Sequence, residues 1–441
     1  MRISSTMMSN NYLKQLNGTY EQYSKLMEQA DGSKLHRASD NAVGYSKYLR
    51  YQNNQISNEQ YQSNVSTAAS WMKNADAALV NVTDLLQTFK AKVEQGSNST
   101  NNESDMKDIA KELLANVQEQ VADLNTQIGD RFLFAGQKDT TMPFEISAGK
   151  MNRGDTFTLD EKQSAFFSGA TGWGKENTTV KQMLKLNGDD GNSYYMNVNT
   201  GDVYTEDFVK NGYKNEDKFD PAKQRVGNIT AITDPPTAYK VSDHFDQYGV
   251  IKTDAGVGTN AKYNVTVDGK QVNLKLSTTK QYIVKYAGDD KYISMVKKNG
   301  GVDKATDTVN VTGQDINGCD LFDVGNDPHS GTARFNQLLY TVAKLDGADY
   351  KWAGEQGMTI ADSAHATVLG AQTKMAARQQ AYNSSSSMLV TQNESITSDI
   401  SDVSSTDVAQ LATKLMEYQT IYSLSLSVGS KILPGTLADY L

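Results

Sequence analysis

Proline and cysteine are scarce in this sequence, and each shortage constrains the fold. The chain has 441 residues, with six prolines and one cysteine, Cys319. A single cysteine cannot form an intramolecular disulfide, so oxidation does not hold the fold together, and we interpret Cys319 as a small buried apolar residue. Proline is absent from residues 1–142 and again from 331–433. Because proline interrupts helices, these two stretches can form long helices, and the middle of the chain is predicted to differ from both ends.

The sequence also lacks basic clusters and long apolar runs. Its formal net charge is -9, with no basic patch to neutralise phosphates, so we do not expect it to bind nucleic acid. No segment approaches the roughly 18 apolar residues that span a bilayer, so membrane insertion is not expected. The first residues contain no apolar run typical of a cleavable secretory signal. We therefore expect a protein that is cytoplasmic or that leaves the cell by a route needing no such signal.

Sequence patterns that would indicate an active site are incomplete. The segment GATGWGK at 169–175 has the spacing of a phosphate-binding loop, but Glu176 follows where Ser or Thr must bind magnesium. The segment GVGTNA at 256–261 resembles a dinucleotide-binding turn, but it leads into a predicted strand instead of a helix. The four histidines are scattered and none has a zinc-protease spacing. We predict no catalytic, cofactor-binding or metal-binding residues and no enzymatic activity.

Apolar residues at alternating steps of three and four, the pattern of a coiled-coil seam, mark both ends of the chain. The members of the two outermost seams are Leu13, Leu16, Tyr20, Tyr23 and Met27 near the N-terminus, and Leu411, Leu415, Tyr418 and Tyr422 near the C-terminus. An isolated helix with one apolar stripe is marginal in water. Because these segments carry few charges, we interpret them as surfaces that pack against each other and against copies or partners; a purely intramolecular bundle is the alternative.

Three further helices are predicted inside these ends. One seam runs from Val65 to Val93, and a second apolar face from Met106 to Ile128 follows Ser104 as a candidate N-cap, so the two helices should form an antiparallel hairpin. A third helix of more than forty residues is expected from 360 to 403. The helix of the C-terminal seam should follow it, capped by Ser405 or Thr406.

The middle of the chain has the alternation typical of strands. The strongest hairpin signal is at residues 263–277, around Asp268-Gly269, and weaker ones are at 193–204 and, around Gly288, at 281–296. The predicted class is mainly α with a β-rich insertion, the terminal helices forming a long antiparallel coiled-coil bundle. The expected domains are 1–45 with 404–441 for assembly, 46–142 with 331–403 as a helical bundle, and 143–330 as an outer insertion that divides in two near residue 235.

Several segments resemble a known family, the flagellar hook-filament junction proteins (hook-associated protein 3), which are relatives of flagellin. The segment NTQIGDRFLFAGQKDTTMPF at 125–144 carries the most specific likeness, and AARQ at 376–379, the opening MRIS and the closing LADYL also match. The residues of these motifs that we single out are Arg131, Phe132, Phe134, Ala135, Gly136, Pro143, Phe144 and Arg378. The likeness covers roughly 1–144 and 335–441 and not the insertion.

The resemblance implies a structural protein without catalysis or cofactor. Its subunits would form a homo-oligomeric ring between hook-associated protein 1 and the flagellin filament. It would leave the cell through the flagellar type III export system, without a cleavable signal peptide and with the help of an export chaperone, and would lie outside the cell in the bacterial flagellum. Two alternatives stay open: the chain is flagellin itself, or its insertion binds glycans or is enzymatic.

Overall fold

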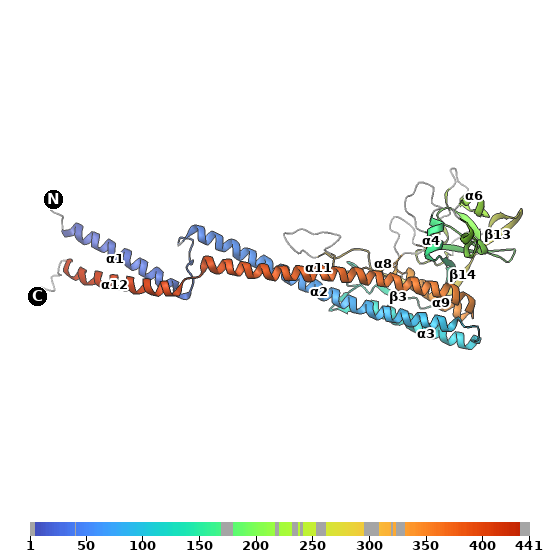
Figure 1. Cartoon of the computed structure of the whole chain (residues 1–441), viewed down its shortest axis with the longest axis horizontal. Coiled ribbons are helices and arrows are strands. Elements are labelled where there is room, and N and C mark those ends of the chain that lie inside the picture. Colours follow the sequence, from blue (N-terminus) through green and yellow to red (C-terminus); the bar gives the residue numbers. More distant parts are fainter. Residues whose placement is uncertain are drawn as a thin grey trace. The chain divides into compact units, whose positions relative to one another are not determined.

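The computed structural model has helices at both ends and antiparallel strands in the middle (Figure 1), which confirms the predicted fold class. The described residues are 5–39, 41–168, 180–216, 220–231, 237–238, 241–252, 262–294, 308–318, 321–322 and 331–432. Cys319, the glycine-rich segments at 169–175 and 256–261, and both chain ends lie outside them. The chain divides into two compact units, Met1–Ser66 with Ser384–Leu441, and Thr67–Asn383. The three-domain division stays a prediction.

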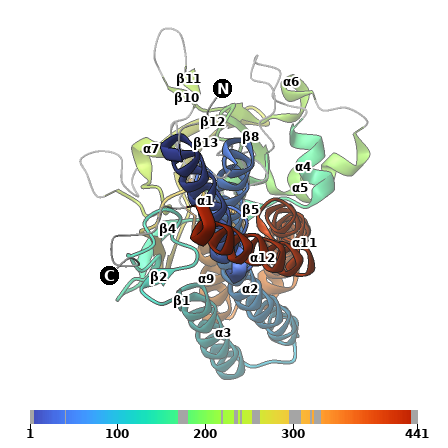
Figure 2. The same ribbon diagram turned by 90° about the vertical axis from the view of Figure 1, so that its left-hand side faces the viewer.

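The first unit is built from paired helices. Its outer pair is α1 (Ser5–Glu28) and α12 (Val408–Ile432), which lie side by side (Figure 1, Figure 2). It also contains the start of α2 (Ala42–Gly96) and the end of α11 (Met358–Ser404), where Gln62 Nε2 donates a hydrogen bond of 3.2 Å to the Leu389 carbonyl. Both α2 and α11 continue into the second unit.

Main-chain hydrogen bonds join the two places where these helices are interrupted. A single 3-10 turn, η1 (Gln29–Asp31), ends at Gly32, whose φ of 93° favours glycine. Lys34 N–H donates to the Ser404 carbonyl at 2.7 Å, and Thr406 N–H donates to the Gly32 carbonyl at 2.9 Å. The connector between α1 and α2 is therefore bound to the connector between α11 and α12.

The helical part of the second unit contains the rest of α2 and α11, with α3 (Glu103–Leu124) and α9 (Ala333–Asp346). The predicted hairpin is confirmed, because α3 lies along α2 and Asn116 Nδ2 donates to the Leu85 carbonyl at 3.0 Å (Figure 2). The α2 seam is fully buried at Ala68, Met72, Ala75, Leu79, Val82, Leu86, Phe89 and Val93. The short helix α10 (Tyr350–Trp352) and a π turn, η3 (Ala353–Gly357), lead into α11.

The rest of this unit is an antiparallel sheet of seven strands with small satellites. The order is β12-β13-β6-β7-β8-β9, with β5 also on β6. The strands of the main sheet are β5 (Thr156–Thr158), β6 (Gln182–Gly188), β7 (Ser193–Met196), β8 (Asp202–Thr205), β9 (Gly227–Asn228), β12 (Lys262–Val267) and β13 (Lys270–Leu276).

Four two-stranded ladders and several short helices complete it. The ladders are β1 (Gln127–Ile128) with β2 (Arg131–Phe132), β3 (Phe144–Ile146) with β15 (Val284–Tyr286), β4 (Met151–Gly154) with β14 (Thr278–Gln281), and β10 (Thr230–Ala231) with β11 (Thr237–Ala238). The helices are α4 (Glu161–Ser168), α5 (Glu206–Lys210), η2 (Gly212–Asn215), α6 (Pro221–Gln224), α7 (Val241–His244) and α8 (Gly313–Asn317).

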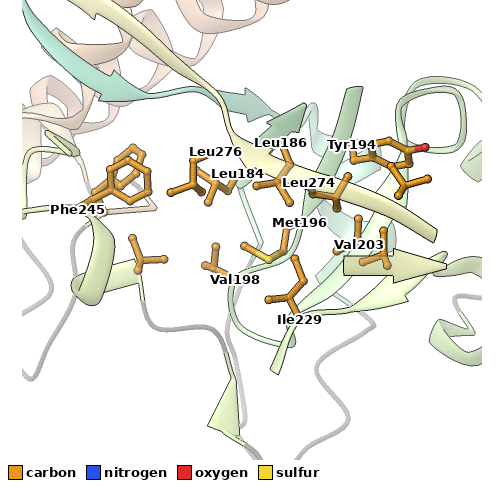
Figure 3. Packing of buried hydrophobic residues seen from close by; sticks show 14 residues of the cluster. Leu184, Leu186, Tyr194, Met196, Val198, Val203, Ile229, Phe245, Leu274 and Leu276 are labelled. Atoms are coloured by element: carbon orange, nitrogen blue, oxygen red, sulfur yellow. The ribbon is translucent and has the colours of Figure 1, made fainter. Parts of the chain in front are cut away.

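One apolar cluster covers the main sheet, with side chains from several strands meeting around Met196 (Figure 3). Leu184, Leu186 and Leu274 are fully buried in it. The predicted hairpin at 263–277 is confirmed, since Val265 pairs with Val272 across a turn whose Asp268 has a φ of 49°. The hairpin at 193–204 is confirmed by the pairing of β7 with β8.

Three local predictions are wrong. The described part of 281–296, which ends at Ser294, does not form a hairpin, because β15 pairs with β3 from far away in the sequence. The N-cap of α3 is Asn102 instead of Ser104, since the Asn102 side chain accepts from Asp105 N–H in a capping box. At α12 Asp407 Oδ1 accepts from the Ala409 and Gln410 N–H groups, so Asp407 serves as the cap.

Candidate assembly surface

The seam between α1 and α12 is narrow and follows a strict alternation of three and four. The members that lie at least half-buried in the described chain are Ser9, Tyr12, Leu16, Thr19, Tyr23 and Leu26 on α1, and Leu411, Leu415, Tyr418, Tyr422, Ser425 and Gly429 on α12. On α12 the predicted residues Leu411, Leu415, Tyr418 and Tyr422 all lie in this seam.

Aromatic contacts fix the middle of the seam. The Tyr23 ring is parallel to that of Tyr422 at 3°, with ring centroids 6.5 Å apart. Tyr20 approaches the same ring from the side at 5.7 Å, tilted by 42°. Offset aromatic pairs of this kind stabilise a contact beyond the area they bury. One side chain of α12 thus holds two side chains of α1.

Near the other end of the seam, Tyr12 crosses to the C-terminal part of α12. Its hydroxyl donates a hydrogen bond of 2.8 Å to the Ser425 carbonyl. A Cβ added at Gly429 would lie 2.1 Å from the Tyr12 hydroxyl oxygen, so glycine is what lets the two helices approach here. Sequence reasoning missed both Tyr12 and Gly429, although Tyr12 is one residue from the predicted Leu13.

On α1 the seam differs from the predicted stripe. Of that stripe only Leu16 and Tyr23 lie in the seam, whereas Leu13, Tyr20 and Met27 are 42%, 56% and 52% exposed. Two overlapping stripes with the same alternation exist on α1, and the one with more apolar residues is not the one that faces α12. Leu13, Tyr20 and Met27, the members of the predicted stripe that lie outside the seam, form an apolar flank beside it.

Many other large apolar side chains of this helix pair are exposed. They are Met7 and Met8 on α1, and Val408, Met416, Ile421, Leu424, Leu426 and Val428 on α12. A groove of about 400 Å³ runs beside the seam, with Met8, Tyr12, Ile421, Leu424 and Val428 among its walls. Contiguous apolar surface of this kind is typical of a site that another protein covers.

The motif at 125–144 lies in the second unit and has a structural role there. Asn125 Nδ2 donates to the Phe144 carbonyl at 2.9 Å, and Phe144 N–H donates back to Asn125 Oδ1 at 3.0 Å. The Phe144 ring packs 5.1 Å from that of Tyr286 and 5.5 Å from that of Phe335. These contacts attach the end of α3 to the strand pair β3–β15 and to α9.

The turn before Phe144 is fixed by glycine and by an aspartate. Gly136 has a φ of 71°, and a Cβ there would meet the Asp289 carbonyl oxygen at 2.2 Å. Gln137 N–H donates to Asp289 Oδ1 at 2.7 Å. Tyr286 Oη lies 3.0 Å from both the Phe134 and Asp289 carbonyl oxygens. Burial raises the pKa of the Tyr286 hydroxyl.

The remaining motif residues also hold neighbouring segments together. Phe132, Phe134 and Ala135 are buried. The Pro143 carbonyl accepts from Ala287 N–H at 2.8 Å, and Arg131 lies 3.4 Å from Asp139.

Arg378 joins α11 to the segment before α8. Its Nη1 donates to the Asn310 carbonyl at 2.8 Å, and its guanidinium lies 5.5 Å from the centre of the Tyr292 ring. Sequence reasoning missed Tyr286 and Asp289, because both lie outside the motif, and it did not single out Asn125, with which the motif begins.

Neither a metal-binding group nor a membrane span is found within the described residues. No cluster of three or more His, Cys, Asp or Glu side chains there could hold a metal ion. No helix in that part of the chain combines the length and the apolar character needed to cross a bilayer.

Parts of the chain are similar to known bacterial flagellar proteins. Residues 3–139 match the family model described as the bacterial flagellin N-terminal helical region. A flagellin from Salmonella montevideo is 26% identical over 302 residues, or 59% of this chain and 58% of that protein. Flagellar hook-associated protein 3 from Salmonella typhimurium is 26% identical over 168 residues, or 37% of this chain and 53% of that protein. The chain therefore spans little more than half the length of these curated relatives.

Among solved structures, FlgL from Xanthomonas campestris aligns with a TM-score of 0.37 and 13% identity, covering 80% of this chain and 99% of that one. The family match runs from the N-terminal helix through α2 and α3 into the Arg131–Phe144 motif. Residues 3–139 are thus similar to the N-terminal helical region of bacterial flagellin, and both a flagellin and a hook-associated protein 3 are among the proteins that resemble the chain.

Proposed function

We propose that the chain is a structural subunit of the hook-filament junction, without catalytic activity. Copies of it form a ring between hook-associated protein 1 and the flagellin filament. The segments 1–45 and 404–441 form the assembly domain, 46–142 with 331–403 the supporting bundle, and 143–330 an outward-facing insertion. The chain leaves the cell through the flagellar type III system, bound before export by a chaperone.

The apolar flank beside the α1–α12 seam carries this proposal. Within one chain Leu13, Tyr20 and Met27 repeat every seven residues on α1 and stay exposed. Their spacing is that of a coiled-coil position, which buries its side chains only when a further helix arrives. The natural occupants are the α1 and α12 helices of neighbouring subunits, because those helices present the same apolar, weakly charged surface.

Flagellin is the second candidate, since the flagellin match covers more of the chain than the match to hook-associated protein 3. The motif segments at the two ends favour the junction protein, because their sequence resembles that family in particular. The two candidate functions differ in whether the purified chain forms filaments by itself.

Substitutions on the flank test the assembly role. The double variant Leu13→Glu and Met27→Glu should fold as the wild type does, because both side chains are already exposed, but it should fail to enter the flagellum. The matched control is Gln22→Glu, which is also exposed and lies about 200° around the helix from Tyr20. Normal filaments on cells with the double variant would contradict the proposal.

A deletion distinguishes the two candidates. Without the chain, a junction role predicts bare hooks and flagellin released into the medium. Long filaments formed by the purified chain alone would instead identify it as a filament subunit.

A further inference from the structure

The methionines of the two compact units lie in opposite environments. In the second unit, the described methionines that are at most 5% exposed are Met72, Met106, Met183, Met196 and Met375. In the first unit every described methionine is at least half exposed, and these are Met7, Met8, Met27, Met388 and Met416. The thioether therefore fills the core of one unit and lies at the surface of the other.

Four of the exposed methionines, Met7, Met8, Met27 and Met416, lie on the α1–α12 pair and are called the surface methionines below. None of them belongs to the seam that joins the two helices. Met8 is a wall of the groove beside the seam, and Met27 belongs to the apolar flank. Met7 and Met416 are the most exposed of the four, at 59% and 66%. Packing within one chain thus leaves all four sulfur-containing side chains open to solvent.

An exposed thioether reacts with a peroxide without help from a cofactor. The sulfur lone pair attacks one peroxide oxygen and the O–O bond breaks. The attacked oxygen stays on sulfur as a sulfoxide, and its proton leaves with the second oxygen as water. The sulfur is oxidised and the peroxide is reduced by the same electron pair. A flexible apolar side chain becomes a polar one, which disrupts interfaces that methionine helps to form.

We propose that the surface methionines are a site of oxidation by peroxide, and that their sulfoxides keep an oxidised copy of the chain out of the flagellum. This inference rests on the proposed function, because the sulfoxides act on the surface that neighbouring subunits cover. The fold of the free chain does not change, since the four side chains already contact water. Methionine sulfoxide is reduced enzymatically, so the block is reversible.

Treatment of the purified full-length chain with hydrogen peroxide tests the chemistry, with peptide mass spectrometry as the measurement. The surface methionines should gain an oxygen atom on the order of tenfold faster than buried Met72 and Met196, because oxidation follows exposure. In urea the rates should become equal, since unfolding exposes every methionine. Equal rates in the folded chain would overturn the inference.

Substitutions test the effect on assembly. The combined variant Met7→Gln, Met8→Gln, Met27→Gln and Met416→Gln imitates the polar sulfoxide, whereas the same four changes to leucine keep the surface apolar and cannot be oxidised. Glutamine, leucine and methionine all favour helices, so circular dichroism should show α1 and α12 in both variants. The glutamine variant should be lost from flagella, and the leucine variant should enter them to a greater extent. Met142→Gln, at a site 48% exposed in the second unit, is the matched control and should enter as the wild type does.

Competition inside one cell tests the role of peroxide itself. When wild-type and leucine copies are made together, peroxide should shift the ratio of incorporated copies toward the leucine variant. An unchanged ratio, or equal incorporation of the glutamine and leucine variants, would overturn the inference. Neither result would contradict the assembly role, because the flank variant Leu13→Glu with Met27→Glu tests that role through charge and without any oxidant.

Discussion

The hydroxyl of Tyr12 on α1 donates a 2.8 Å hydrogen bond to the Ser425 carbonyl on α12, directly beside Gly429. The absence of a side chain at Gly429 makes this contact possible, because a Cβ there would overlap the hydroxyl oxygen. The two helices that form the candidate assembly surface are therefore joined by a polar contact as well as by their apolar seam.

Gly429→Val should separate α1 from α12 at this point. The valine side chain overlaps the Tyr12 hydroxyl, and the hydrogen bond to Ser425 should be lost. Hydrogen exchange of the α1 amides should therefore be faster than in the wild type. Gly18→Ala is the control: nothing lies within 4 Å of a Cβ at this helical position, so the change should stabilise α1 by about 0.5–1 kcal/mol. Equal exchange in the valine variant and the wild type would contradict the contact.

Leu415→Asp should disrupt the seam while the second unit stays folded. Leu415 lies half-buried between the helices, and a carboxylate there should cost at least about 2 kcal/mol within the first unit. The near-ultraviolet dichroism of the three tryptophans and the unfolding of the second unit should not change, whereas incorporation into flagella should be abolished. Thr413→Asp, on the exposed side of α12, is the folding control. Filaments of normal appearance with Leu415→Asp would exclude the seam from assembly.

Gly136→Ala should destabilise the second unit more than Gly129→Ala does. Both glycines have a positive φ, 71° and 64°, so alanine is strained at each, by about 1–3 kcal/mol. Only at Gly136 does the added Cβ also meet the Asp289 carbonyl oxygen, at 2.2 Å, whereas it meets nothing within 4 Å at Gly129. Urea unfolding of the two variants measures the difference. Equal losses would mean that the close approach to Asp289 has no energetic weight.

Ionisation of the Tyr286 hydroxyl should make the protein less stable at high pH. Its hydroxyl pKa is raised above the ordinary value of 10 by burial. Below pH 10 the proton is bound in both the folded and the unfolded chain and the stabilisation is complete. As pH rises further, the unfolded chain loses its proton first, so the free energy of unfolding falls until the folded pKa is passed.

The variant Tyr286→Phe removes this contribution. At neutral pH it should be less stable by about 0.5–1.5 kcal/mol, because the hydroxyl contacts to Phe134 and Asp289 are lost. Between pH 9 and pH 11 its stability should decline less steeply than that of the wild type. Buried Tyr195 and Tyr204, whose pKa values are also raised, keep part of the slope in both proteins. Parallel slopes in denaturant unfolding would contradict the assignment to Tyr286.

Periodicity in the sequence predicts those helices that bury one face. The α2 seam up to Val93 and the apolar face of α3 were found this way, since each presents a single stripe to its neighbours. Helix α9 was not found from its periodicity. Its residues from Ala333 to Val342 are all buried, including the polar Arg334 and Gln337. A helix that is enclosed on every side has no apolar stripe to detect.

Pairing between distant segments was equally hidden. The alternation at 284–286 is real, but its partner is β3 and not the residues that follow Gly288, so a local hairpin was predicted where the chain forms a long-range ladder. On α1 the choice between two overlapping stripes depends on which one faces α12, and counting apolar residues selected Leu13 and Tyr20 over Tyr12 and Thr19. In each case the missing information was the position of a neighbour.

The joint between the two breaks of the first unit has a mechanical consequence. Lys34 and Ser404, and Gly32 and Thr406, are linked through backbone atoms alone. Side-chain replacement leaves such a link intact unless proline removes an N–H group or a side chain at Gly32 strains its backbone, whose φ is 93°. Apart from Gly32, the side chains of both connectors can therefore change without breaking the link, and a bending or twisting load on one connector is shared with the other.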